Sequence, residues 1–156
     1  MERFAVTPAR LDPAAIGAVV ARECDGGLAA FVGLVRNANA GRTVRWLEYE
    51  AFASLALSTF EQIAREASSR WPEARLAIHH RTGRVDIGEA SVVIAAASPH
   101  RVEAFAVCRF AIERVKQIAP VWKHEHFEGG DVWIEGATAD PDSTGALEAA
   151  FERACT

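Results

Sequence analysis

The chain has 156 residues, of which 50% are hydrophobic and 24% charged, and its formal net charge is −4. This length and balance predict a single folded domain over residues 1–156 and exclude a disordered protein. The acidic charge argues against a protein that coats DNA or RNA. No apolar run is long enough to predict a membrane span.

The first half of the chain predicts three strands and two helices. Asp12 precedes a proline and an apolar run, which is typical of a capped helix start. Further on, Leu47 and Tyr49 alternate with acidic residues, as in a strand with one buried face. Ser54 is expected to cap the helix that follows. In order, the predicted elements are a strand at 3–6, a helix from 13, a strand at 28–35, a polar loop at 37–43, a strand at 44–52 and a helix from 54 to Pro72.

The second half predicts strands at 76–81 and 91–97, with a short element around Val85 and Ile87 between them. A long helix is expected to begin near Ser98 and to end at Pro120. Its predicted core face consists of Phe105, Cys108, Ile112 and Val115. A hairpin at 121–127 and 132–135 and a last helix at 143–154 follow. Because helices and strands mix without strict β-α-β alternation, we expect an α+β fold with a mostly antiparallel sheet and two long helices.

Three cysteines, Cys24, Cys108 and Cys155, lie far apart and form no C-x-x-C motif. This usage is typical of reduced thiols and supports neither a disulfide framework nor a zinc ribbon. We therefore expect a cytoplasmic protein.

Two stretches place cations beside backbone features that suit anions. Arg36 follows a strand that contains Gly33, a residue that allows a ligand or another strand to approach closely. His100 and Arg101 follow Ser98-Pro99 at the expected start of a helix, where outward N–H groups favour a phosphate. The alternatives are a solvated arginine at a strand end and an ordinary helix start with a basic first turn.

Lys116 and Lys123 are separated by a proline. A lysine near the C-terminus of a helix is ordinary and mildly stabilising. Two lysines held close together behave differently from a single one, because the repulsion between like charges makes each ammonium easier to deprotonate. One of them could then act as an acid, a base or a nucleophile.

His124 and His126 form an H-x-H pattern that places both imidazoles on one face of a strand. No third ligand stands at a recognisable spacing, so we predict no metal site. The sequence also lacks a P-loop, a G-x-G-x-x-G motif, a G-x-S-x-G elbow and an H-E-x-x-H motif.

At these residues the sequence resembles the large, catalytic subunit of molybdopterin synthase. The similarity covers about residues 28–135 and leaves the tail at 138–156 outside it. Each block is short, and their order and spacing make the resemblance specific. The blocks are Phe31–Arg36, Leu47–Phe52, His80–Gly83 with Val85 and Gly88, Ser98–Arg101, and Lys116 through Pro120–Lys123.

The resemblance implies an α/β-hammerhead fold and a homodimer of large subunits within a heterotetramer. A small ubiquitin-like subunit would dock at each end and insert its Gly-Gly tail, activated as a thiocarboxylate. Two sulfurs would convert cyclic pyranopterin monophosphate into the molybdopterin dithiolene, a step of molybdenum cofactor biosynthesis that needs no metal, ATP or other cofactor.

The resemblance also implies roles for residues of this chain. Lys116 and Lys123 would be catalytic, with Lys116 as the main group. Position 124 is histidine where relatives often carry a more basic residue, so its charge depends on pH. Gly136-Ala137-Thr138 stands where some relatives have an arginine. The implied substrate-binding residues are Leu34, Val35, Arg36, His100, Arg101, Lys116, Lys123, His124 and Glu125, with Phe31 and Trp122 shaping the pocket.

Two other functions remain open from the sequence. One is a non-catalytic dimer that binds the tail of a ubiquitin-like protein. The other is a phosphodiester hydrolase that uses His100 and the arginines.

Overall fold

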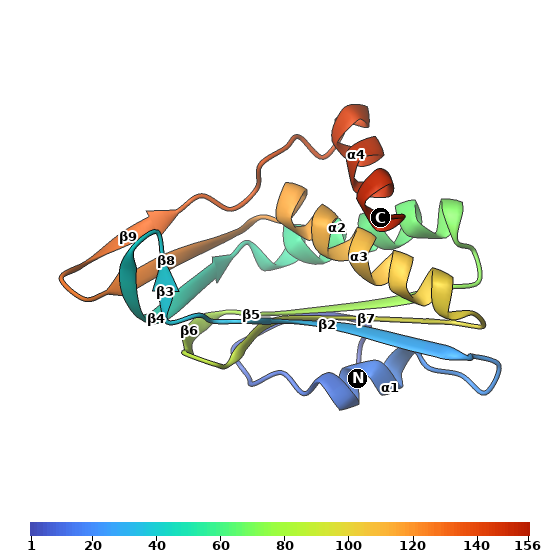
Figure 1. The fold of residues 1–156 in the computed structure, drawn as a ribbon, viewed down its shortest axis with the longest axis horizontal. Coiled ribbons are helices and arrows are strands. Elements are labelled where there is room, and N and C mark those ends of the chain that lie inside the picture. Colours follow the sequence, from blue (N-terminus) through green and yellow to red (C-terminus); the bar gives the residue numbers. More distant parts are fainter.

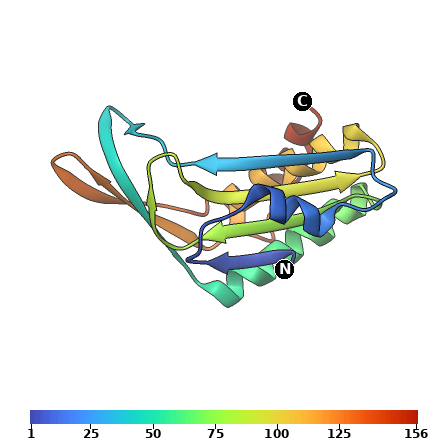
Figure 2. The ribbon, with the colours of Figure 1, turned by 90° about the horizontal axis from the view of Figure 1, so that it is seen from below.

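A four-stranded sheet with helices on both faces forms the larger part of the molecule (Figure 1). The computed structural model describes residues 1–156. The strand order is β1-β5-β7-β2, and only β1 and β5 are parallel. Figure 2 shows β2 at one edge. The strands are β1 (Phe4–Thr7), β5 (Arg75–Arg81), β7 (Ala90–Ser98) and β2 (Gly27–Leu34).

The helices divide between the two faces of this sheet. Helix α1 (Pro13–Val20) covers one face, and α2 (Ala53–Arg70) and α3 (Arg101–Ile118) cover the other (Figure 2). Helix α4 (Thr144–Ala154) packs on α3. The Asp12 side chain accepts hydrogen bonds from the first N–H groups of α1, which confirms the predicted cap. None of the helices has the length and hydropathy required to cross a bilayer.

The core lies in two layers because the central strands are covered twice. Ile16 and Val20 of α1 pack with Val93 and Ala95 of β7 on one side. Side chains of α2 and α3 fill the larger layer on the other side. Burial on both faces explains why residues 91–97 form a continuous apolar run rather than an alternating one.

A second, five-stranded sheet projects from one end of the first (Figure 1). Its strands are β3 (Ala38–Asn39), β4 (Arg42–Ala51), β6 (Gly83–Asp86), β8 (Val121–Phe127) and β9 (Gly130–Ile134). Tyr49 lies opposite Lys123 in the antiparallel pairing of β4 and β8, and Glu48 lies opposite His124. Since successive side chains of a strand point to opposite faces, these two pairs lie on opposite faces of the sheet.

The predicted α+β class with a mostly antiparallel sheet and two long helices is confirmed. Three local predictions were wrong. Ser54 does not cap α2, because β4 runs directly into the helix and Phe52 occupies the cap position without a side-chain bond. Phe105 is 68% exposed, because α3 turns Ala104, Val107 and Cys108 toward the sheet instead. The polar loop at 37–43 contains β3, which pairs with β4 in a tight hairpin.

Candidate functional site

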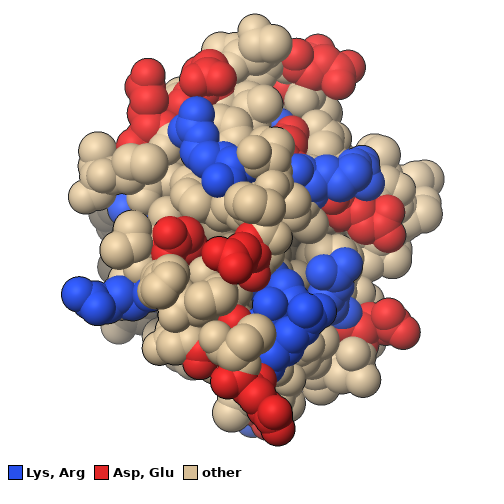
Figure 3. Space-filling view, turned by 90° about the vertical axis from the view of Figure 1, so that its right-hand side faces the viewer, with Lys and Arg blue, Asp and Glu red and all other residues tan.

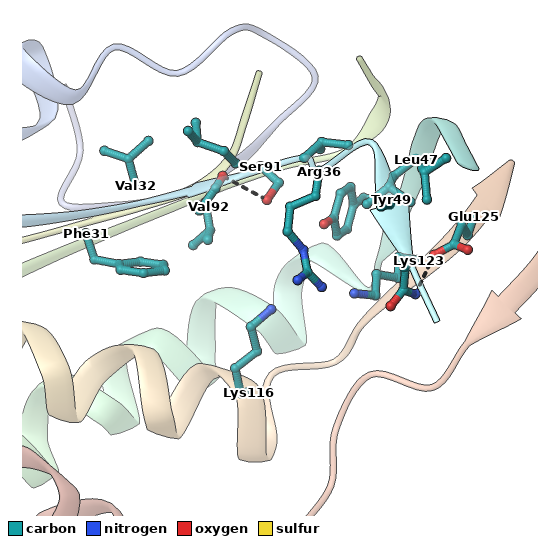
Figure 4. Close-up of a pocket in the computed structure, with 16 residues that line it drawn as sticks. Phe31, Val32, Arg36, Leu47, Tyr49, Ser91, Val92, Lys116, Lys123 and Glu125 are labelled. Carbon is teal, nitrogen blue, oxygen red and sulfur yellow. Dashed lines mark hydrogen bonds between the residues drawn. The ribbon is translucent and has the colours of Figure 1, made fainter. Parts of the chain in front are cut away.

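A hollow of about 420 Å³ lies where the two sheets meet, at the end of β2 (Figure 4). Strands β2, β3, β4, β7 and β8, helix α3 and the segment after β2 contribute to its wall. The polar residues that line it are Arg36, Asn39, Tyr49, Ser91, Lys116, Lys123 and Glu125, and the apolar ones include Phe31, Leu34, Val35 and Leu47.

Gly33 sets the path of β2 into this hollow. A Cβ atom at Gly33 would lie 2.6 Å from Cγ1 of Val92, so a side chain here would push β2 away from β7. The strand register shifts directly after Gly33, between Gly33 and Leu34. The chain then turns so that Val35 is buried and Arg36 points into the hollow toward Lys116 (Figure 4).

Lys116 and Lys123 enter the hollow from different elements, the last turn of α3 and strand β8. Although Lys116 as a residue is exposed to solvent, partial burial of its ammonium lowers its pKa, and repulsion from Lys123 lowers the pKa further. The two lysines therefore share one cleft. Together with Arg36 they give the hollow a cationic wall suited to anionic groups.

A smaller hollow of about 130 Å³ lies against the same two lysines. Tyr49 and His80 also line it, and Gly136 contributes backbone to its wall. Burial, with repulsion from Lys116 as a lesser cause, lowers the pKa of His80 to about 4, so its imidazole is neutral at pH 7. Burial also raises the pKa of Tyr49, which keeps the phenol protonated.

Sequence reasoning assigned no site role to Tyr49 or His80. The alternation along residues 44–52 correctly placed Tyr49 on the buried face of its strand. Nothing in the sequence indicated that this face also borders a hollow, because the hollow depends on how β4 meets α3 and β8. The two rings contact each other edge to face, with their centroids 5.1 Å apart.

Glu125 lines the larger hollow but is already engaged by protein donors. Asn39 Nδ2 donates to one of its oxygens at 2.7 Å, and Arg42 Nε donates to the other at 2.8 Å. Burial alone would raise the pKa of this carboxyl, but the two hydrogen bonds, together with the positive charges of Arg42 and Lys123, lower the pKa below its ordinary value. Glu125 therefore fixes the β3–β4 hairpin at the edge of the hollow.

His100 and Arg101 line neither of the two hollows. They lie at the start of α3, and Lys116 lies in its last turn. The 15 residues from Arg101 to Lys116 span about 22 Å along a helix. Within one chain, His100 and Arg101 therefore lie at the opposite end of α3 from Lys116.

Figure 3 shows the end of the molecule at which α3 begins. Lys and Arg side chains form separate groups there, with Asp and Glu between them.

His124 is also separate from the hollow, because it lies on the opposite face of β8 from Lys123. Its Nε2 atom lies 2.6 Å from Oδ2 of Asp131. Glu48, His124 and His126 offer ligand atoms that all lie within 4.8 Å of one another, so this face carries the residues that could hold a metal ion.

Comparison with known proteins connects this geometry to a family. The family model for the MoaE protein matches residues 6–118. The molybdopterin synthase catalytic subunit of Bacillus subtilis is 46% identical over 135 residues, which cover 86% of this chain and 85% of that protein. The crystal structure of molybdopterin synthase from Staphylococcus aureus superposes with a TM-score of 0.84 at 34% identity, covering 86% of this chain and 98% of that chain.

A more distant structure has the same fold. It is a protein–protein complex of subunits 1 and 2 of the molybdopterin-converting factor from Helicobacter pylori, and its matched chain is 20% identical with a TM-score of 0.72. The match covers 94% of this chain and 99% of that chain.

Proposed function

Because the chain belongs to the MoaE family of molybdopterin synthase catalytic subunits, enzymes of molybdenum cofactor biosynthesis, we propose that its two hollows carry out a sulfur transfer. The donor is the C-terminal thiocarboxylate of a small ubiquitin-like subunit. The acceptor is cyclic pyranopterin monophosphate, which receives two sulfurs in turn to give the molybdopterin dithiolene. The observation that carries this proposal is that Lys116 and Lys123 border both hollows.

The charges of the two reactants explain the need for these lysines. The pterin carries a cyclic phosphate and the tail carries an anionic thiocarboxylate, so the reactants repel each other. Fixed cations in a partly desolvated site offset this repulsion and stabilise negative charge that develops in the transition state. Lys116 acts as an ammonium beside the thiocarboxylate and the tetrahedral species formed from it, and Lys123 assists it and holds substrate.

The two hollows differ in the reactant that they suit. The larger one has Arg36 in its wall and room for a bicyclic or tricyclic ring system, so it takes the pterin. The smaller one is narrow and bordered by Gly136, which suits an extended tail that ends in two glycines without side chains. The two reactants then approach each other at Lys116 and Lys123, which are common to both walls.

A second copy of the chain supplies His100 and Arg101. Strand β2 is an edge of its sheet and packs against α3. Leu28, Phe31 and Leu34 of β2 are exposed to solvent, and so are Val102 and Phe105 of α3. Exposed apolar residues along an unpaired edge are typical of an interface.

Two-fold antiparallel pairing of β2 with its copy would bring the Gly27 end of one strand against the Leu34 end of the other. Because Gly27 pairs with Ser98, His100 and Arg101 of the partner subunit would then lie beside the larger hollow and bind the pterin phosphate there.

The relatives are named catalytic subunits, and a subunit is one component of a larger enzyme. This name supports the proposal that the chain binds a second, different subunit. If two copies of the chain form the dimer and each binds the tail of one small subunit, the complete enzyme is a heterotetramer. We place the reaction in the cytoplasm, in keeping with three unpaired cysteines.

A sulfur-transfer assay tests the proposal. The purified chain is mixed with cyclic pyranopterin monophosphate and the small subunit in its thiocarboxylate form, and dithiolene formation is followed by mass spectrometry. A matched reaction uses the small subunit with an ordinary carboxylate. Product is expected in the first mixture and not in the second.

Two other outcomes would reject sulfur transfer. Capture of the thiocarboxylated partner without any product would indicate a non-catalytic binder. Opening of the cyclic phosphate by the chain alone would indicate a phosphodiester hydrolase.

A further inference from the structure

The face of the second sheet that points away from the hollows carries a cluster of two imidazoles and a carboxylate, Glu48, His124 and His126. We propose that this cluster binds a divalent transition-metal ion, with Zn²⁺ as the first candidate. The site is separate from the sulfur-transfer residues, because Lys123 and Glu125 alternate with the two histidines along β8 and point to the other face.

Strand pairing brings the three ligands together. Glu48 lies directly opposite His124, and His126 is the next residue of β8 on the same face. Their donor atoms lie within 4.8 Å of one another. Ligands around a tetrahedral zinc ion lie roughly 3.4 Å apart, given bond lengths near 2 Å. Metal binding therefore requires the ligand atoms to move closer together by rotation of their side chains.

An unsatisfied atom points into the cluster. The Nε2 atom of His126 is buried and has no hydrogen-bond partner. Oε1 of Glu48 lies 3.4 Å from it, outside hydrogen-bond geometry. Glu48 Oε1 already accepts a hydrogen bond from Trp46 Nε1 at 3.3 Å, so only the imidazole nitrogen lacks a partner. Buried nitrogen atoms without partners are rare in folded proteins, and a metal ion bound by Nε2 would give this atom a partner.

Aromatic residues hold both imidazole rings in place. Trp46 stacks on His126 with the ring centroids 4.6 Å apart, and Trp133 stacks on His124 at 4.4 Å. Both pairs are nearly parallel, with an interplanar angle of 13°. The guanidinium of Arg84 lies over the Trp46 ring, 4.3 Å from the ring centroid. Rings held in this way lose little freedom when they bind a metal.

Asp131 provides a fourth group, with Oδ2 at 2.6 Å from Nε2 of His124. Two imidazoles with carboxylate oxygens and no thiolate form a donor set that suits Zn²⁺ better than Ca²⁺ or Mg²⁺, which prefer oxygen alone. Because the ligands come from β4 and β8, with Asp131 on β9, the bound ion would tie these strands together.

Zinc binding to the full chain tests this proposal. The protein is stripped with a chelator, dialysed against Zn²⁺, and its metal content is measured by elemental mass spectrometry. Two variants remove one ligand each: His126→Phe keeps an aromatic ring against Trp46, and Glu48→Gln keeps the size of the side chain. His100→Ala removes a histidine at the far end of the molecule and serves as the matched control.

We expect one Zn²⁺ per chain for the unchanged protein and the control, and affinity lower by about tenfold or more in both ligand variants. Zn²⁺ should also raise the unfolding temperature of the first two proteins and not of the ligand variants. Circular dichroism verifies that the variants fold. The proposal would be overturned if the unchanged protein held no stoichiometric zinc, or if both ligand variants bound zinc as tightly as the unchanged protein.

Discussion

Lys116 is the residue on which the proposed chemistry depends most. Lys116→Ala should reduce product formation by about 10²-fold or more, because it removes the cation nearest the developing negative charge. Its free energy of unfolding should change by no more than about 0.5 kcal/mol, since the residue is exposed and makes no ion pair. Single-turnover assays and urea unfolding measure the two quantities. Unchanged turnover would remove Lys116 from the mechanism.

The protonation state of Lys116 gives a second prediction at this scale. Burial and the nearby Lys123 lower its pKa below the ordinary value of 10.5. If the ammonium is the active form, the rate falls as pH rises through this lowered pKa. Lys116→Arg should retain part of the activity and move this fall to higher pH, because the guanidinium stays charged. A rate that instead increases over this pH range would show that the neutral amine is the active form.

Single residues also show what the sequence could and could not predict. The two lysines and Arg36 were assigned through a resemblance, and the structure confirms that they share a hollow. His124 was assigned to the same site through the same resemblance. Strand alternation places neighbours on opposite faces, so the rule that paired His124 with His126 also separates His124 from Lys123.

The segment after β9 packs closely against the start of β8. A Cβ atom at Gly136 would lie 1.9 Å from the carbonyl oxygen of Val121, so no side chain fits without moving this segment. Gly136→Ala should cost about 1–3 kcal/mol of unfolding free energy. It should also raise the KM for the thiocarboxylated partner, because the segment borders the smaller hollow.

Gly145→Ala in α4 is the matched control for this substitution. No atom lies within 4 Å of the added Cβ, and alanine in a helix stabilises by about 0.5–1 kcal/mol relative to glycine. Equal unfolding free energies for the two alanine variants would contradict the packing argument.

Most elements were predictable because their signals are local: the Asp12 cap, the alternation in β4 and the glycines between β8 and β9. Which face of α3 is buried could not be predicted in this way. Its buried face includes Arg114, which is fully buried and forms two hydrogen bonds to Glu66 of α2. A buried arginine paired across two helices has no periodic signal, so apolar spacing alone favoured Phe105 for the core.

The stability of the whole molecule should depend on His80. Its pKa is about 4 in the folded protein, against 6.5 without burial, so the unfolded chain takes up the proton first as pH falls. Stability is therefore lost between about pH 6.5 and 4, by up to about 3 kcal/mol for a shift of this size. Urea unfolding at a series of pH values measures this loss.

His80→Asn should flatten the pH dependence over that range, while His100→Asn, which changes an exposed histidine, should leave it unchanged. An equally steep loss in the His80 variant would assign the effect to other groups.

The arrangement of the complete site could not be predicted from one chain. The formal charge of −4 argued against a protein that coats nucleic acid, but it did not show that the cations divide between the two ends of α3. Sequence order does not show which residues meet across a molecular two-fold axis. The proposed reaction therefore requires a composite site, in which Lys116 of one copy acts beside Arg101 of the partner subunit.

Mixed dimers test this composite site most directly. Lys116→Ala and Arg101→Ala chains are each nearly inactive at limiting pterin, and they are mixed, dissociated and reassociated before the sulfur-transfer assay. Random pairing makes half of the dimers hybrids, and each hybrid holds one intact site of two, so about a quarter of the unchanged activity should return. Activity that stays at the level of the separate variants would contradict a site shared between two copies.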